Sequence, residues 1–194
     1  MSKENTVVAA AKIIHVSRTR SMIVAALMAA LLAASAWIVL PIGAVPVTLQ
    51  VFIVLLVGLL LSPGWAAASV GVYVLMGAIG VPVFSGGMGG LGHLAGPTGG
   101  YIIGFLIAAP AVAFTRRAFV SRGGNWAAPW SLATLVGIVI IYTLGWLQLS
   151  LVTGMGLLPA FVAGVLPFVV VDLAKAVVAV AVAGTLRRTG MLFD

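Results

Sequence analysis

The chain has very few charged residues. Only 7% of its 194 residues are charged and 63% are hydrophobic, whereas about 25% charged residues is usual for soluble domains. Residues 21–115 contain no Asp, Glu, Lys or Arg. A segment of that length cannot form the surface of a water-soluble domain, because water-facing positions require polar side chains. We therefore predict that lipid and neighbouring helices surround most of the chain.

Cysteine is absent, and acidic residues and histidines are scarce. The lack of cysteine excludes disulfides and thiolate metal sites, and His15 and His93 lie too far apart in the sequence to indicate a metal site. No Gly-Lys-Ser/Thr triplet is present, which excludes a Walker A ATPase. Ser85 lacks the Gly-x-Ser-Gly context expected of an activated intramembrane serine. We expect a protein that is not an enzyme and needs no cofactor.

Hydropathy breaks at glycine, proline and basic residues. It predicts an all-α integral membrane protein with a single bundle of six helices, whose boundaries carry an error of about two to four residues. The first apolar run continues past Ala36 to Leu40, and this length favours a spanning helix over a cleaved signal peptide. The six predicted helices are residues 21–40, 47–62, 65–80, 97–115, 129–151 and 167–186.

The basic residues predict the orientation of these helices. They form three clusters: one before the first predicted helix, one at 116–122 and one at 187–188. Such clusters stay on the cytoplasmic side, so the net charge of +7 does not indicate a nucleic-acid partner. The parity of spans then places both termini inside. We expect a cytoplasmic segment 1–20, a membrane bundle 21–186 and a cytoplasmic tail 187–194.

This topology places the glycine- and proline-rich connections on the outer side. They are residues 41–46, 81–96 and 152–166. Irregular backbone at membrane depth must be covered by protein or line a cavity, because its polar groups need partners. The pattern indicates a pocket that opens outward, although ordinary connecting loops would also fit residues 41–46.

Asp172 and Lys175 are the only charged residues inside a predicted span. Each costs about 2.5–3.5 kcal/mol to insert, so such residues usually face the bundle interior and serve a function. Their i, i+3 spacing places both on one helical face, about 7 and 12 Å from the outer end of the helix. We interpret them as ligand contacts, and the alternative is an ion pair that only fixes helix packing.

Other candidate residues carry weaker signals. Gln50 near the outer end of its helix could contact a ligand or bond a neighbouring helix. Tyr142 and Trp146 lie one turn apart and could stack on a ring or anchor the helix at the interface. The start of the helix after Thr98 offers backbone N–H groups to a carboxylate. Small residues spaced by four indicate close packing against a helix of this bundle or of another subunit: Ala25, Ala29 and Ala33.

Several of these segments together resemble a known family. The chain is similar to the BioY family, the biotin-specific S component of energy-coupling-factor (ECF) transporters. The glycine-rich segment and the Asp/Lys pair, occurring in this order, are the most specific part of the resemblance. The similar segments are residues 45–50, 80–90, 96–105 and 166–175.

The resemblance implies a multi-pass protein of a bacterial or archaeal cell membrane that captures biotin on its outer side. It implies a transmembrane coupling (T) subunit and two ABC-type ATPases as partners, a lid at residues 41–47, and a coupling-subunit surface at the alanine column named above. Carried over to this sequence, it makes Asp172 and Lys175 the best ligand contacts, with Pro41, Gly43, Val45 and Pro46 in the lid. We further predict that the biotin site includes Thr48, Gln50, Phe84, Ser85, Gly89, Gly90, Tyr142 and Trp146.

Other functions remain open at this point. The same architecture could serve another vitamin. Asp172 could instead carry protons in a secondary transporter, or the chain could be a membrane scaffold that binds no ligand.

Overall fold

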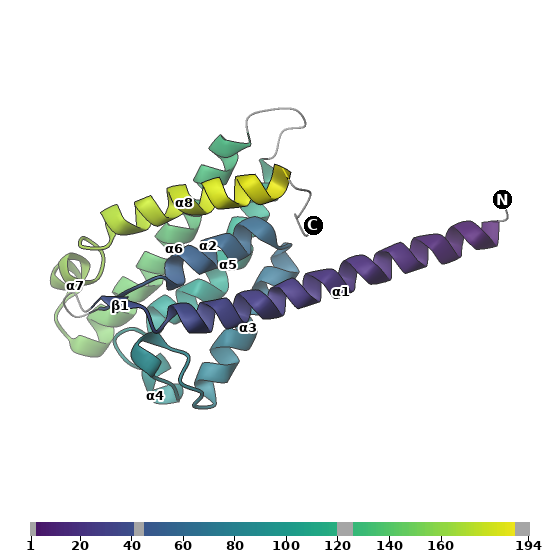
Figure 1. The fold of residues 1–194 in the computed structure, drawn as a ribbon. Helices are drawn as coiled ribbons and strands as arrows, with labels where there is room; N and C mark the ends of the chain where they lie inside the picture. Colours follow the sequence, from purple (N-terminus) through teal and green to yellow (C-terminus); the bar gives the residue numbers. More distant parts are fainter. Residues whose placement is uncertain (1–2, 41–44, 120–125, 189–194) are drawn as a thin grey trace.

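The computed structural model describes residues 3–40, 45–119 and 126–188, with only the helical backbone for residues 3–17. The fold is helical, as the apolar composition predicts. Figure 1 shows long helices packed side by side, with the N-terminal half of α1 projecting beyond the others. The elements are α1 (Lys3–Ser35), β1 (Val39–Leu40), β2 (Val47–Thr48), α2 (Gln50–Leu60), α3 (Pro63–Ala78), η1 (Ser85–Gly87), α4 (Leu91–Leu94), α5 (Gly99–Ala118), α6 (Ala127–Thr153), α7 (Leu157–Gly164) and α8 (Val169–Arg188).

Five of the predicted helices correspond to α2, α3, α5, α6 and α8, and every boundary agrees within three residues. The prediction for the first helix, 21–40, is wrong at both ends. Helix α1 begins at Lys3 and ends at Ser35. Residues 39–40 instead form a short antiparallel ladder with residues 47–48. The hairpin was missed because its apolar strand continues the apolar run of the helix without a polar break.

The lengths of the helices bear on how they cross a membrane. Four segments are long and apolar enough to span it: Arg18–Ser35, Gly99–Ala118, Ala127–Thr153 and Val169–Arg188. Helices α2 and α3 are apolar but shorter. A short span is accommodated by local thinning of the bilayer or by flanking residues. The structure therefore describes a multi-pass arrangement of at least these four segments.

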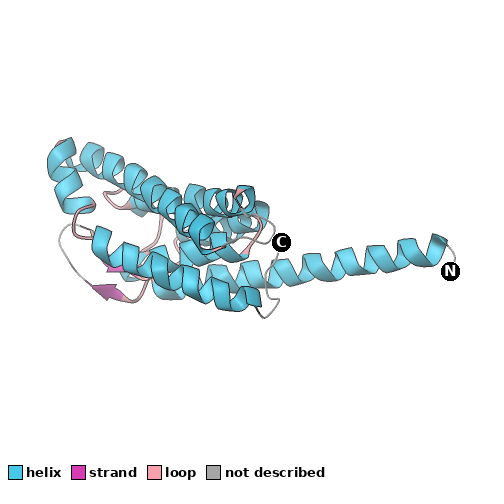
Figure 2. Cartoon of the chain, turned by 90° about the horizontal axis from the view of Figure 1, so that it is seen from above, coloured by secondary structure: helices cyan, strands magenta, loops and turns pink. Residues whose placement is uncertain are grey.

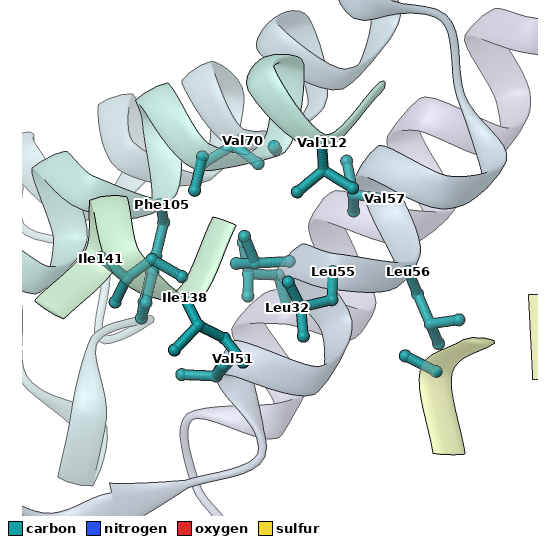
Figure 3. Close-up of a cluster of buried hydrophobic side chains, with 14 of the residues drawn as sticks. Leu32, Val51, Leu55, Leu56, Val57, Val70, Phe105, Val112, Ile138 and Ile141 are labelled. Carbon is teal, nitrogen blue, oxygen red and sulfur yellow. The ribbon is translucent and has the colours of Figure 1, made fainter. Parts of the chain in front are cut away.

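Glycines allow the central helices to approach closely. Helices α5 and α6 form the most extensive helix pair among the described elements. A Cβ atom added at Gly104 of α5 would lie 2.9 Å from the Cα of Ile141 in α6, which is closer than carbon atoms normally approach. Apolar side chains of several helices meet beside this contact, including Phe105, Ile138 and Ile141 (Figure 3).

The alanine column of α1 faces the interior of this chain. Ala25 and Ala29 are buried, and Ala33 packs partly against the core. The Ser69 hydroxyl of α3 donates to the Ala25 carbonyl at 2.8 Å. The sequence left open whether these alanines pack against a helix of this bundle or of another subunit, and here they pack within the bundle. The small side chains on the exposed face are instead those of Ala26, Ala30 and Ala34.

Two of the basic clusters meet at one end of the bundle. The guanidinium carbon of Arg116, in the last turn of α5, lies 5.9 Å from the ring centre of Trp130. The guanidinium carbon of Arg187, in the last turn of α8, lies 5.8 Å from the same ring centre. Distances below about 6 Å permit a cation–π attraction. This proximity agrees with the sequence argument that both clusters lie on the same side of a membrane.

Candidate ligand-binding site

A cavity lies at the end of the bundle that carries the β-hairpin, away from the basic clusters. Its volume is about 570 Å³, including the open space at its mouth. In Figure 2 the strands lie at the end of the bundle opposite the projecting part of α1. The lining residues are Val45, Pro46, Val47, Thr48, Gln50, Val51, Ser85, His93, Thr98, Tyr101, Ile102, Phe105, Ile141, Tyr142, Phe168, Asp172 and Lys175.

The two charged residues form an ion pair in the wall of this cavity. The Lys175 Nζ lies 2.7 Å from Oδ1 of Asp172, and the two side chains are only 11% and 5% exposed. Both come from α8, where Asp172 belongs to the first turn. An acid near a helix N-terminus also gains from the helix dipole. The pair is electrically neutral as a whole, yet it offers a strong donor and a strong acceptor.

Two further groups orient this pair. The hydroxyl of Tyr142 in α6 donates to Oδ2 of Asp172 at 2.7 Å. The Lys175 ammonium also donates to the backbone carbonyl of Thr48 in β2 at 2.7 Å. An ammonium has three N–H donors and each carboxylate oxygen has two acceptor positions. Capacity therefore remains on both charged groups for a ligand that donates and accepts hydrogen bonds.

Gln50 belongs to a second hydrogen-bonded network next to the hairpin. Its side-chain amide donates to the Tyr73 hydroxyl of α3, and its Oε1 accepts from the Thr48 hydroxyl at 3.1 Å. The Gln50 backbone N–H in turn donates to that hydroxyl at 3.2 Å. Gln50 and Thr48 are both buried. Of the two roles that the sequence left open, Gln50 bonds a neighbouring helix and so ties α2 to α3. Both residues line the cavity, and their contact with a ligand stays a prediction.

Another part of the cavity wall carries uncharged polar groups. Ser85 comes from η1, His93 from α4 and Thr98 from the N-cap of α5. The Thr98 Oγ1 lies 3.2 Å from Nε2 of His93, and the imidazole ring stacks on Phe84 with 5.4 Å between ring centres. Burial lowers the pKa of His93, because it disfavours the charged imidazolium. The ring is therefore neutral at pH 7.

Some residues predicted for the ligand site lie outside the cavity lining. Phe84 is buried beneath it, where its ring fills the space over Gly77. Gly90 donates its backbone N–H to the Gly77 carbonyl at 2.6 Å, and Gly89 packs against the 80–81 backbone. These residues position the 84–90 segment. Direct contact of Phe84, Gly89 or Gly90 with a ligand stays a prediction.

Trp146 also lies apart from the lining. The indole of Trp146 donates to the Leu157 carbonyl at 2.6 Å and packs edge-on against Phe161, so it joins α6 to α7. Pro41 and Gly43 lie outside the described residues. The described lid residues, Val45 and Pro46, do line the cavity.

Sequence reasoning missed several lining residues. His93 was assigned no role, and Tyr101 was not singled out. The Tyr101 hydroxyl donates to the Gly164 carbonyl at 2.7 Å, which joins α5 to α7. The periodicity could have found part of this wall, because Thr98, Tyr101 and Phe105 recur at helical spacing after the predicted helix start. His93 left no such signal, because it lies in a four-residue helix between two glycine-rich stretches.

The residues of the cavity are suited to a small organic ligand. Within the described ranges, no group of three or more His, Cys, Asp or Glu side chains lies close enough to hold an ion. Most of the wall is apolar, and a few polar groups converge on it. This combination is typical of sites that bind a small organic molecule.

Comparison with known proteins identifies the family. The sequence model of the BioY family matches residues 4–191, which is nearly the whole chain. The chain belongs to the BioY family. It is 41% identical over 170 residues to a probable biotin transporter BioY of Pyrococcus horikoshii, a match that covers 88% of this chain and 98% of that relative. A biotin transporter BioY of Thermotoga maritima is 39% identical over 170 residues, covering 87% and 96% of the two chains.

A solved structure has the same fold as this BioY-family chain. It is a crystal structure of the S-component for biotin from an ECF-type ABC transporter. The two chains superpose with a TM-score of 0.80 at 26% identity, over 97% of this chain and 95% of the other. The two chains thus share one fold over nearly their whole lengths.

Proposed function

We propose that this chain is the biotin-binding S component of an ECF-type importer in a prokaryotic cell membrane. The observation that carries the proposal is the neutral Asp172–Lys175 pair in the wall of a largely apolar cavity. Biotin has a ureido group with two N–H donors and one carbonyl acceptor, next to an apolar ring and chain. The pair offers the complementary acceptor and donor, and the relatives are biotin transporters by name.

In this proposal biotin enters with its ureido ring first. Asp172 accepts a hydrogen bond from a ureido N–H, and Lys175 donates to the ureido oxygen. The apolar side chains of Ile102, Phe105 and Phe168 cover the ring and chain. Tyr142 holds the Asp172 carboxylate in place, and the hairpin closes over the occupied cavity.

The same proposal places the chain in a larger complex. The six longer helices cross the membrane with both termini in the cytoplasm. A transmembrane coupling subunit and two ABC-type ATPases drive the release of biotin inward. The chain itself then acts as a binding subunit and catalyses no reaction, in line with the lack of a Walker A sequence.

The test is equilibrium binding of biotin to the purified full chain. Asp172→Asn and Lys175→Ala should each weaken binding by about 10- to 100-fold, because each removes a hydrogen bond between biotin and a charged group, which contributes about 1.5–3 kcal/mol. Thr185→Val is the matched control on α8, since its hydroxyl bonds only within its own helix, and it should bind like the wild type.

Competition assays separate this function from the alternatives. Thiamine and riboflavin should fail to displace biotin, whereas displacement by either would indicate an S component for another vitamin. Biotin uptake by liposomes that hold the chain alone, driven by a pH gradient, would contradict the proposal and favour a secondary transporter. Unchanged affinity in both the Asp172 and Lys175 variants would remove the site assignment.

A further inference from the structure

The cavity carries polar groups on two different walls. Asp172 and Lys175 belong to α8, which packs against α2 and α6, whereas the α4 helix that carries His93 packs against α3 and α5. Apolar side chains such as Ile102 and Phe105 form much of the remaining surface. A ligand with one polar group at each end of an apolar body would match this arrangement. The proposed function uses only the wall formed by α8.

The two walls differ in how favourably they would bind a negatively charged group. On α8 the Lys175 ammonium already neutralises Asp172 at 2.7 Å, so an added anion would meet the Asp172 carboxylate. Asp172 is the single carboxylate among residues whose side chains the structure describes. The wall around His93 therefore lacks this repulsion. It carries hydroxyl groups, an imidazole and the positive end of the α5 dipole, and the last of these also favours an anion.

We propose that His93, supported by Thr98 and Ser85, binds the carboxylate of the ligand and takes up a proton when it does so. This rests on the proposed function, because biotin carries a carboxylate at the end opposite its ureido ring. His93 thereby becomes a specificity residue that distinguishes the free acid from neutral derivatives. The proton comes from solvent and binds the imidazole, and no covalent bond of the ligand changes.

The imidazole is held in place for this role. Its ring stacks on Phe84 at an interplanar angle of 20°, and Phe84 is fully buried. One ring nitrogen lies 3.2 Å from the Thr98 hydroxyl, which leaves the other nitrogen for a ligand. The Ser85 hydroxyl oxygen is buried at the cavity wall and has no hydrogen-bond partner among the described residues. A carboxylate oxygen would satisfy it.

Proton uptake follows from the change in surroundings. Without ligand, burial lowers the pKa of His93, so the ring is neutral at pH 7. A bound carboxylate raises that pKa, because an opposite charge nearby favours the imidazolium. The extra affinity is therefore fully present below the pKa of the free protein. It is lost as the pH rises through the pKa of the complex. The other titratable groups at the cavity are Tyr101, Tyr142, Asp172 and Lys175.

The experiment compares biotin with biotin amide, its neutral carboxamide, on the purified full chain. Biotin should bind about tenfold more tightly at about pH 5.5 than at about pH 8, which is the effect expected of one charge-assisted hydrogen bond. The biotin carboxylate stays ionised over this range, because the usual carboxylic-acid pKa is about 4. Biotin amide should show no such trend. Calorimetry of the wild type in two buffers of different ionisation enthalpy should show proton uptake with biotin only.

Two variants assign the effect to His93. His93→Gln keeps hydrogen-bonding capacity without titrating, and His93→Phe keeps the stacking on Phe84. Both should bind biotin with a flat pH profile and no proton uptake. His15→Gln is the matched control, because His15 is the only other histidine of the chain, and it should behave like the wild type.

The possible outcomes separate this inference from the proposed function. A pH trend that survives in both His93 variants, an equal trend for biotin amide, or no proton uptake by the wild type would overturn the role of His93 while biotin binding stands. If neither variant folds, the two-buffer measurement on the wild type still decides. If biotin does not bind the wild type at any pH, the proposed function fails instead.

Discussion

Single side chains in the cavity are held by partners that do not themselves need to touch the ligand. Tyr142 is the clearest case, because its hydroxyl donates to Oδ2 of Asp172 at 2.7 Å while Oδ1 accepts from Lys175. The sequence suggested Tyr142 as a ring that stacks on the ligand. Its position in the cavity wall allows that contact, but its hydrogen bond also fixes the direction of the Asp172 carboxylate.

Replacing Tyr142 with Phe should therefore weaken biotin binding without unfolding the protein. This hydrogen bond to a charged group contributes about 1.5–3 kcal/mol, but it is already present without ligand, so only part of that energy bears on affinity and we expect a loss of about tenfold or less. Thr143→Val is the matched control, since the neighbouring Thr143 hydroxyl bonds only the Val139 carbonyl of its own helix. Equal affinities of the two variants, measured by biotin titration, would show that the Tyr142 hydroxyl does not orient Asp172.

Whole elements approach one another where glycine removes a side chain. The α5–α6 contact depends on this at Gly104, which faces the Ile141 backbone. An alanine there should destabilise the protein by about 1–3 kcal/mol, because an inserted methyl group forces the two helices apart. Gly64→Ala is the control, since open space surrounds Gly64. Thermal unfolding in detergent measures both variants, and equal midpoints would contradict this account of the helix pair.

Hydropathy predicted the helices more completely than it predicted the residues of the site. Five helices agree with their predicted ranges, because each lies between glycine, proline or basic residues that interrupt an apolar run. The hairpin after α1 and the α7 helix at Leu157–Gly164 were missed, since both are as apolar as the spans beside them. The Asp172–Lys175 pair was predicted because charge is rare in a span. His93 depends on tertiary packing against Phe84, and sequence spacing does not reveal such packing.

The two ends of the molecule carry different polar groups. Arg116 and Arg187 meet around Trp130 at one end, and the cavity lies at the other. The positive-inside rule places the arginine end in the cytoplasm. The glycine-rich segment with η1 and α4 should then face the external medium, and the turn between α2 and α3 should face the cytoplasm.

Cysteine labelling in intact cells tests this orientation without background, because the chain has no native cysteine. Gly92→Cys in α4 should react with a membrane-impermeant maleimide added outside, and Gly64→Cys at the start of α3 should react only after permeabilisation. The two positions are matched, since both glycines are exposed and a Cβ at either would meet nothing within 4 Å. The reverse labelling pattern would invert the topology and close the cavity to external biotin.

The contact between Lys175 and the hairpin has one more consequence. Its acceptor is the main-chain oxygen of Thr48, which every amino acid supplies. A side-chain scan of residues 45–48 would therefore leave this acceptor in place at every step and would report only the loss of side-chain contacts. Replacing the peptide bond after Thr48 with an ester would weaken that oxygen as an acceptor, and only such backbone chemistry could measure how firmly the ammonium tethers the entrance.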